Sequence, residues 1–201
     1  MGDGLDTKAV RTRQRILASA AREFAARGFD GTSLRQVAAG ADLTLGSLYF
    51  HFTTKADLVA EVLRDAVDFA LARVDQAISE LPSEPGNAEA LSAAVRAHLH
   101  ALHESRDRGA AVVRVMDGAS TAPVPAARAH ARRYITRWRT LVKEAQRDNV
   151  VSSGVDPRVL TDLLLGAMNA TVGPRQLAPH QVDTIAVTVC EVFLRPAASP
   201  G

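Results

Sequence analysis

The sequence has only one cysteine, Cys190, so no disulfide can form within the chain. The cysteine content therefore gives no support for secretion. Long apolar runs are also missing, because no stretch approaches the roughly 20 residues that cross a bilayer. The N-terminal residues contain no apolar segment of the kind found in signal peptides. We therefore expect a cytoplasmic protein without a membrane partner.

Aromatic residues and net charge are low as well. Aromatics make up 4% of the chain, whereas apolar residues together make up 47% and alanine is abundant. This composition supports a buried core and favours helices over sheets. The formal net charge is only +2, so binding of a nucleic acid would require a basic surface that is local.

Apolar residues recur with helical periodicity along almost the whole chain, and no strand-like alternation competes with it. Gly28 predicts the end of the first helix, because glycine commonly follows the last helical residue. Pro125, Pro157 and Pro179 predict helix starts. The sequence thus predicts an all-α fold of about nine helices, at 8–27, 33–39, 44–50, 54–80, 88–105, 109–119, 125–149, 157–172 and 179–194.

The start of the fourth predicted helix divides the chain into two domains. Residues 1–53 contain two short helices around a tight turn, which is typical of a helix-turn-helix DNA-binding domain. Residues 54–195 are expected to form a ligand-binding and dimerisation domain. Residues 196–201 are expected to form a disordered tail.

The second short helix carries side chains suited to a DNA groove. A helix that enters the major groove, about 12 Å wide, needs small or polar groups facing the bases. Thr44, Gly46 and Ser47 meet this need, and Tyr49 can offer its hydroxyl to a phosphate. Lys55 opposes the dipole of the next helix, which suggests that an anion binds at that helix N-terminus. Further cations suited to backbone contacts are Lys8, Arg11, Arg13 and Arg15.

The segment TSLRQVAAGADLTLGSLYFHFTTKADLVAEVL, residues 32–63, resembles the DNA-binding segment of the TetR family of transcriptional regulators. The family pattern resembles T-x-x-x-x-I-A-x-x-A-G-V-S-x-G-x-L-Y-x-H-F-x-x-K-x-x-L. The resemblance implies that the protein binds double-stranded operator DNA through Ser33, Arg35, Thr44, Leu45, Gly46, Ser47, Tyr49, His51 and Lys55. It also implies a small core of Phe24, Leu34, Val37, Leu48 and Phe52. Asp42 stands where the family usually has glycine, so the turn is expected to differ slightly.

Trp138 lies on an apolar stripe of the helix predicted at 125–149. Core packing is the ordinary role of such a stripe. Lining of a ligand site is the alternative, because a buried indole N–H needs a hydrogen-bond partner. The residues predicted to line a site for a small-molecule effector are Leu102, Val113, Met116, Tyr134, Trp138, Met168, Asn169 and Thr171.

The stretches YFHFTTKADLVAEVL and RWRTLVKEAQRDNVVSSGVDP resemble the γ-butyrolactone receptors of actinomycetes, which share a pocket tryptophan at the position of Trp138. Ala66 and Ala167 stand where those receptors often carry glutamine and threonine, so a butenolide or an antibiotic-like signal is an equal alternative. The resemblance implies a repressor that releases a palindromic operator when a small hydrophobic signal binds. A multidrug-responsive efflux regulator and a helical carrier without DNA binding are alternatives, and an activator role stays open.

The last two predicted helices offer an interface for a homodimer. Each has an apolar stripe, and two such helices from each chain can form a four-helix bundle. The predicted interface residues are Leu160, Leu164, Ala167, Val182, Ile185, Ala186, Val189 and Phe193.

Chemistry beyond binding is not expected. No nucleophile–base pair points to catalysis, and no cofactor motif is present. His98, His100 and His103 fall on different helix faces, and no cysteine or carboxylate completes a metal site with them. We therefore predict that the protein is not an enzyme and has no metal and no cofactor.

Overall fold

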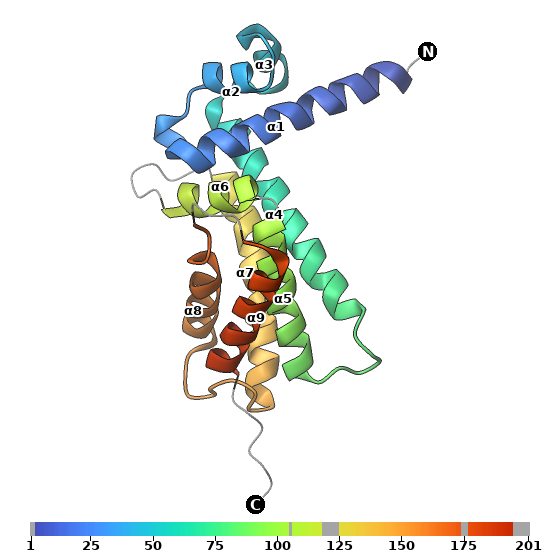
Figure 1. The fold of residues 1–201 in the computed structure, drawn as a ribbon, viewed down its shortest axis with the longest axis vertical. Coiled ribbons are helices and arrows are strands. Elements are labelled where there is room, and N and C mark those ends of the chain that lie inside the picture. Colours follow the sequence, from blue (N-terminus) through green and yellow to red (C-terminus); the bar gives the residue numbers. More distant parts are fainter. Residues whose placement is uncertain (1–2, 105, 118–124, 174–176, 195–201) are drawn as a thin grey trace, which may run out of the picture. The chain divides into compact units, whose positions relative to one another are not determined.

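The structure, a computed structural model, describes residues 3–104, 106–117, 125–173 and 177–194. Within these ranges the regular elements are nine helices and no strand (Figure 1), which confirms the all-α prediction. The helices are α1 (Asp3–Gly31), α2 (Leu34–Gly40), α3 (Leu45–His51), α4 (Lys55–Ser79), α5 (Asn87–Glu104), α6 (Arg106–Asp117), α7 (Pro125–Arg147), α8 (Pro157–Asn169) and α9 (Pro179–Phe193). The predicted tail, 196–201, lies outside the described residues.

The first helical segment ends at Gly28, as predicted, and a second short segment follows it. α1 continues to Gly31 across a kink at Gly28, whose φ of 69° and ψ of −175° interrupt the helical backbone. Glycine adopts this conformation at low cost because it has no Cβ. The Thr32 hydroxyl donates to the Gly28 carbonyl at 2.8 Å and so satisfies an acceptor near the kink. Gly28 therefore ends the first helical segment, and the label α1 covers both segments.

The chain divides into two compact units. Unit 1 comprises residues 1–66 and 107–130, and unit 2 comprises residues 67–106 and 131–201. The predicted boundary at residue 54 does not coincide with this division. The reason is that the first half of α4 supplies Leu58, Val59, Val62 and Leu63 to the core of unit 1.

The core of unit 1 gathers apolar side chains from α1, α2, α3, α4 and α6. Phe24, Val37, Leu48 and Phe52 are buried together, as predicted, and Leu34 packs against them from a partly buried position. Ala111 and Val115 of α6 complete this cluster. Because Leu48 is buried, the orientation of α3 about its own axis is fixed.

The core of unit 2 is formed by α5, α7, α8 and α9 together with the later part of α4. Trp138, Leu99, Leu164 and Met168 are among its fully buried side chains. Ion pairs join α7 to α4 at the rim, with Arg133 Nη2 2.6 Å from Asp68 and Arg137 Nε 2.8 Å from Asp75. None of the helices in the described ranges is both long and apolar enough to cross a membrane.

Candidate nucleic-acid interface and ligand site

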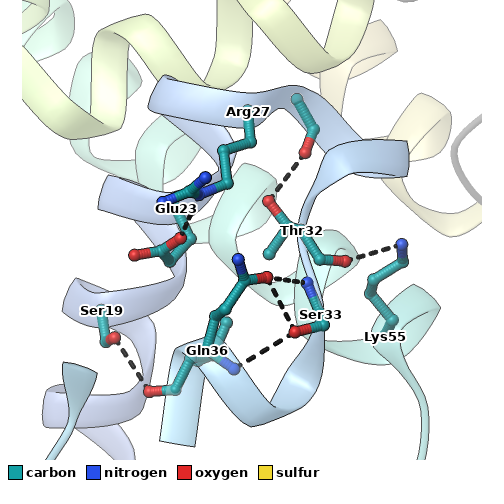
Figure 2. A network of polar contacts seen from close by, with 9 residues as sticks. Ser19, Glu23, Arg27, Thr32, Ser33, Gln36 and Lys55 are labelled. Carbon is teal, nitrogen blue, oxygen red and sulfur yellow. Dashed lines mark hydrogen bonds and ion pairs between the residues drawn. The ribbon is translucent and has the colours of Figure 1, made fainter. Parts of the chain in front are cut away.

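α2 begins at a reciprocal cap between Ser33 and Gln36 (Figure 2). The Gln36 backbone N–H donates to Ser33 Oγ at 3.3 Å, and Gln36 Oε1 accepts from the Ser33 backbone N–H at 2.8 Å and from its hydroxyl at 2.7 Å. This is the capping box that the Ser-x-x-Gln spacing favours. The Ser19 hydroxyl, buried in α1, donates to the Val37 carbonyl at 2.9 Å and ties α2 to α1.

The turn between α2 and α3 places Asp42 in the left-handed region of the backbone. Its φ is 52°, a conformation that glycine adopts freely and that aspartate tolerates better than most residues. Arg15 holds this turn from α1 by donating to the Ala41 carbonyl, and its guanidinium lies 3.4 Å from the Asp42 carboxylate. The backbone therefore keeps the left-handed turn that a glycine would make, although the residue differs from the family pattern.

α3 presents an exposed face made of the side chains predicted to contact DNA. Thr44 caps the helix by accepting from the Ser47 backbone N–H at 3.1 Å. Thr44, Gly46, Ser47 and Tyr49 are exposed. Of the other predicted contacts, Ser33 and Arg35 are exposed, whereas Leu45 and His51 are half-buried. These residues thus form an accessible surface on unit 1, and their contacts with DNA stay predictions.

Phe50, which the sequence pattern left without a role, is 87% exposed on the same helix. Its ring meets the His51 ring edge-on, with centroids 5.5 Å apart. An aromatic side chain exposed beside Tyr49 enlarges the apolar part of this surface.

Lys55 does not point at the N-terminus of its own helix, where an anion had been inferred. Its ammonium donates to the carbonyls of Phe29 at 2.8 Å and Thr32 at 2.9 Å, and lies 4.3 Å from the centroid of the Phe29 ring. Figure 2 shows the contact with Thr32. A cation beside the last carbonyls of α1 is favourable, so Lys55 has a structural reason for its place. The inferred anion site loses its support, although a DNA contact of Lys55 stays a prediction.

The cations predicted near the N-terminus of the chain divide into two pairs. Arg13 Nη2 lies 2.8 Å from Glu61, its guanidinium stacks over Phe52, and Arg15 binds the α2–α3 turn. Lys8 and Arg11 are exposed. Arg13 and Arg15 therefore stabilise unit 1, and Lys8 and Arg11 remain the candidates for contacts with a phosphate backbone.

Unit 2 contains a buried cluster of His98, Tyr134 and Trp138. His98 Nδ1 lies 2.5 Å from the Tyr134 hydroxyl, and the His98 and Trp138 rings meet edge-on with centroids 5.6 Å apart. His98 Nε2 and Trp138 Nε1 are both buried and make no hydrogen bond of normal geometry, although the Asn169 side chain lies beside His98 and the Tyr134 hydroxyl lies beside Trp138. Buried polar atoms are normally hydrogen-bonded, so these two atoms are the candidate contacts for a ligand in this cluster.

Burial also sets the protonation of this cluster. Desolvation lowers the pKa of His98 to about 4, with the neighbouring Asn169 side chain acting in the opposite direction and His103 in the same one. Burial raises the pKa of Tyr134 above its usual value. At neutral pH the imidazole is therefore uncharged and the phenol keeps its proton. His98 was considered at first only as a metal ligand, and no pattern in the sequence linked it to Tyr134.

The three histidines of α5 have separate partners. His98 contacts Tyr134, His100 Nε2 lies 2.9 Å from the Asp183 carboxylate, and His103 Nε2 lies 2.9 Å from the Thr171 hydroxyl. Because Thr171 donates its own proton to the Met168 carbonyl at 2.6 Å, its oxygen accepts from His103. The three imidazoles therefore tie α5 to three different helices or helix ends of unit 2.

The predicted ligand-lining residues are only partly brought together. Tyr134, Trp138 and Met168 share the packed core of unit 2, and Asn169 lies beside His98. Leu102 is buried in the same unit, whereas Val113 lies on the part of α6 that belongs to unit 1. The side chain of Met116 lies outside the described residues. A ligand at Trp138 therefore has to displace part of a packed core.

Five of the eight residues predicted at the dimer interface face the interior of the chain's own fold, and the other three are half-buried. Leu160, Leu164, Val182, Ala186 and Val189 are buried in the core of unit 2. Ile185 and Phe193 pack against that core from partly buried positions, and Ala167 is half-buried. The apolar side chains exposed on α8 and α9 are instead Val159, Leu163, Val187 and Val192. Figure 1 shows α8 and α9 lying side by side in unit 2.

Comparison with known proteins identifies the sequence family. Residues 16–62 match the family model "Bacterial regulatory proteins, tetR family", and residues 84–173 match "Tetracyclin repressor-like, C-terminal domain". The HTH-type transcriptional repressor KstR2 of Mycolicibacterium smegmatis is 41% identical over 71 residues, which is 35% of this chain and 35% of that protein. The match thus spans about a third of the length of that relative. The HTH-type transcriptional regulator UidR of Escherichia coli K12 is 26% identical over 167 residues, 82% of each chain.

Solved structures share the fold. AibR, solved in complex with isovaleryl coenzyme A and operator DNA, superposes with a TM-score of 0.75 at 20% identity, covering 92% of this chain and 100% of that one. The regulator PfmR of Thermus thermophilus superposes with a TM-score of 0.73 at 22% identity, covering 94% of this chain and 98% of PfmR. The two matching family models together cover more than half of the chain. The chain therefore belongs to the tetR family of bacterial regulatory proteins.

Proposed function

We propose that the protein is a transcriptional repressor that binds a palindromic operator as a homodimer and releases it when a small hydrophobic signal binds unit 2. The observation that carries this proposal is that α3 has one buried apolar side and one exposed polar side. Leu48 is fully buried in the core of unit 1, whereas Thr44, Ser47 and Tyr49 are exposed. A short helix anchored on one side and small and polar on the other is suited to the major groove.

The chemistry of the signal follows from the buried cluster in unit 2. Trp138 Nε1 is a donor only, and the neutral His98 donates from Nε2 when its Nδ1 accepts the hydrogen bond of the Tyr134 hydroxyl. A compact ligand with one or two oxygen acceptors and an apolar body would satisfy these atoms beside Met168. γ-Butyrolactones and butenolides carry a ring carbonyl of this kind. Ala66 and Ala167 offer no side-chain hydrogen bond, so recognition would depend on the cluster itself.

An acyl coenzyme A is a second candidate signal. AibR was solved with isovaleryl coenzyme A, and FadR of Bacillus subtilis was solved with stearoyl-CoA at a TM-score of 0.70 to this chain. Both similarities are below 25% identity and support the fold only. The apolar core around Trp138 is compatible with an acyl chain as well as with a lactone.

Operator binding is tested first on α3. Replacing Tyr49 by alanine is expected to weaken the affinity for the operator about tenfold or more, since a phosphate hydrogen bond and ring contacts are lost. The measurement is a gel shift at fixed salt with the DNA upstream of the protein's own gene. Tyr49→Phe serves as the matched control, because it keeps the ring and removes only the hydroxyl. An unchanged affinity of a folded Y49A protein would contradict the assignment of α3 as the reading helix.

Release by the signal is measured on the preformed complex. A γ-butyrolactone, a butenolide and isovaleryl coenzyme A are each titrated into the protein–operator complex, and Trp138, the single tryptophan, reports binding by its fluorescence. Nearly complete release requires a ligand that prefers the DNA-free state by about 5 kcal/mol. Release by the lactones supports the first candidate, and release by the coenzyme A ester alone replaces it with the second. A carrier without DNA binding would show the fluorescence change and no operator complex.

Homodimerisation is proposed on the exposed apolar side chains of α8 and α9. Leu163 is 56% exposed and Val192 is 73% exposed, and together with Val159 and Val187 they leave an apolar surface on adjacent helices. Leu163→Glu is expected to convert the dimer to a monomer, because two carboxylates would be buried across a twofold axis. Sedimentation velocity measures this, with Asp162→Ala as a control that leaves the apolar surface intact. A wild-type monomer at all concentrations would exclude the proposal.

A further inference from the structure

A second candidate binding site lies on the outside of unit 2, where α7 meets the start of α8. It is a half-open cleft of about 560 Å³ lined by Thr136, Arg139, Thr140, Lys143, Asp156, Pro157 and Arg158. A volume of this size is in the range of small-molecule sites. Its lining is unlike the apolar cluster around Trp138, because it carries cationic side chains from two segments of the chain.

The helical spacing of α7 creates one wall of this cleft. Thr136, Arg139, Thr140 and Lys143 follow each other at i, i+3, i+4 and i+7 and so share one face of α7. Trp138, their neighbour in sequence, points into the core. The opposite wall is the first turn of α8, where Asp156 accepts from the Arg158 backbone N–H at 2.7 Å.

The cations of this cleft lack the ion pairs that Arg133 and Arg137 form elsewhere on α7. Arg133 and Arg137 form ion pairs with α4, whereas Arg139, Lys143 and Arg158 form no ion pair with any described residue. Arg139 Nε is moreover buried without a hydrogen-bond partner among those residues. Three cationic side chains without an ion pair in one cleft leave a positive charge that a bound anion would neutralise.

We propose that this cleft binds the phosphate or diphosphate group of a small molecule. Arg139 and Lys143 approach the anion from α7, and Arg158 approaches it from the start of α8. The Thr136 hydroxyl can add a further donor, whereas the Thr140 hydroxyl already donates to the Thr136 carbonyl at 3.2 Å. Asp156 is the single carboxylate in the lining, and its bond to the Arg158 N–H partly compensates its charge. Arginine binds phosphate through two N–H groups at once, which favours phosphate over a monovalent anion such as chloride.

The proposal does not depend on operator binding, and it is tested on the full-length protein by titration calorimetry. Inorganic pyrophosphate and inorganic phosphate are the probes, at a constant ionic strength of about 0.15 M that screens unspecific attraction. We expect saturable binding of pyrophosphate with one site per chain, tighter than that of phosphate. Lys143→Gln and Arg158→Gln are each expected to weaken this binding about tenfold, since a hydrogen bond to a charged group is lost.

The matched control is Arg147→Gln, which removes one positive charge from an exposed position one turn further along α7 and outside the cleft. The dissociation constant of R147Q for pyrophosphate is expected to stay within about twofold of the wild-type value, because screening reduces the effect of a distant charge. Arg139→Gln tests the buried Nε, with thermal unfolding as a check that the variant folds. Lys143 and Arg158 are exposed, so their variants are expected to fold. They test pyrophosphate binding in the cleft even if R139Q does not fold. Absence of saturable binding, or an equal loss in R147Q, would overturn the proposal.

Discussion

Replacing Trp138 by alanine is expected to lower the free energy of unfolding by about 3–5 kcal/mol, the range found when large buried aromatic side chains are truncated. Trp138 is fully buried and lies at the centre of the unit 2 core, in contact with His98 and Tyr134. The neighbouring helices cannot collapse far enough to fill the space of an indole. Urea unfolding followed by circular dichroism measures the loss.

Trp138→Phe is the matched variant, since it keeps an aromatic ring and removes the indole N–H. That N–H makes no hydrogen bond of normal geometry, so its removal is expected to cost little stability. W138F is therefore expected to be much less destabilised than W138A. In the ligand titration, W138F should lose more free energy of lactone binding than free energy of unfolding. The reason is that the indole N–H is proposed to donate to the ligand. Equal stability of W138A and wild type would contradict the buried position of Trp138.

Stability is expected to fall as the pH is lowered from about 6.5 towards 4, by up to about 3 kcal/mol from His98 alone. Burial lowers the pKa of His98 in the folded protein from 6.5 to about 4, so in this interval the unfolded chain binds a proton that the folded chain does not. The contribution is therefore fully present above pH 6.5 and is lost as the pH falls through this window. Burial also lowers the pKa of the half-buried His103, which acts in the same direction.

The measurement is the free energy of unfolding from urea curves at several pH values. Carboxylates also titrate near pH 4, so the wild type is compared with His98→Gln, which has no titrating group at this position. The slope of stability against pH between 4 and 6.5 should be shallower in H98Q. The same slope in both proteins would show that His98 is not buried in its neutral form.

The sequence was sufficient to predict the parts of the fold that depend on local signals. The Ser33–Gln36 cap and the short α3 follow from residue types at fixed spacing, the burial of Leu48 and Phe52 was implied by the resemblance to the TetR pattern, and the structure has all of them. These features involve neighbours in sequence, which is why a pattern can predict them.

Contacts between distant segments could not be predicted in this way. The two apolar sides of α9 look alike in sequence, and only the packing decides that Val182, Ala186 and Val189 face inward and Val192 outward. The partners of Lys55 are backbone carbonyls, which carry no residue-type signal at all. The bond between His98 and Tyr134 joins α5 to α7 and depends on the relative rotation of both helices. In each case the missing information is the orientation of one helix against another.

The bonds of Lys55 have a mechanical consequence for unit 1. The ammonium joins the first turn of α4 to the carbonyls of Phe29 and Thr32, and Thr32 directly precedes the cap of α2. A shift of the start of α4 along its axis therefore pulls on the end of α1 and the beginning of α2 at the same time. The helix-turn-helix would then travel as one rigid piece, keeping the angle between α2 and α3 constant. The affinity for DNA would then depend on the position of the helix-turn-helix and not on its internal conformation.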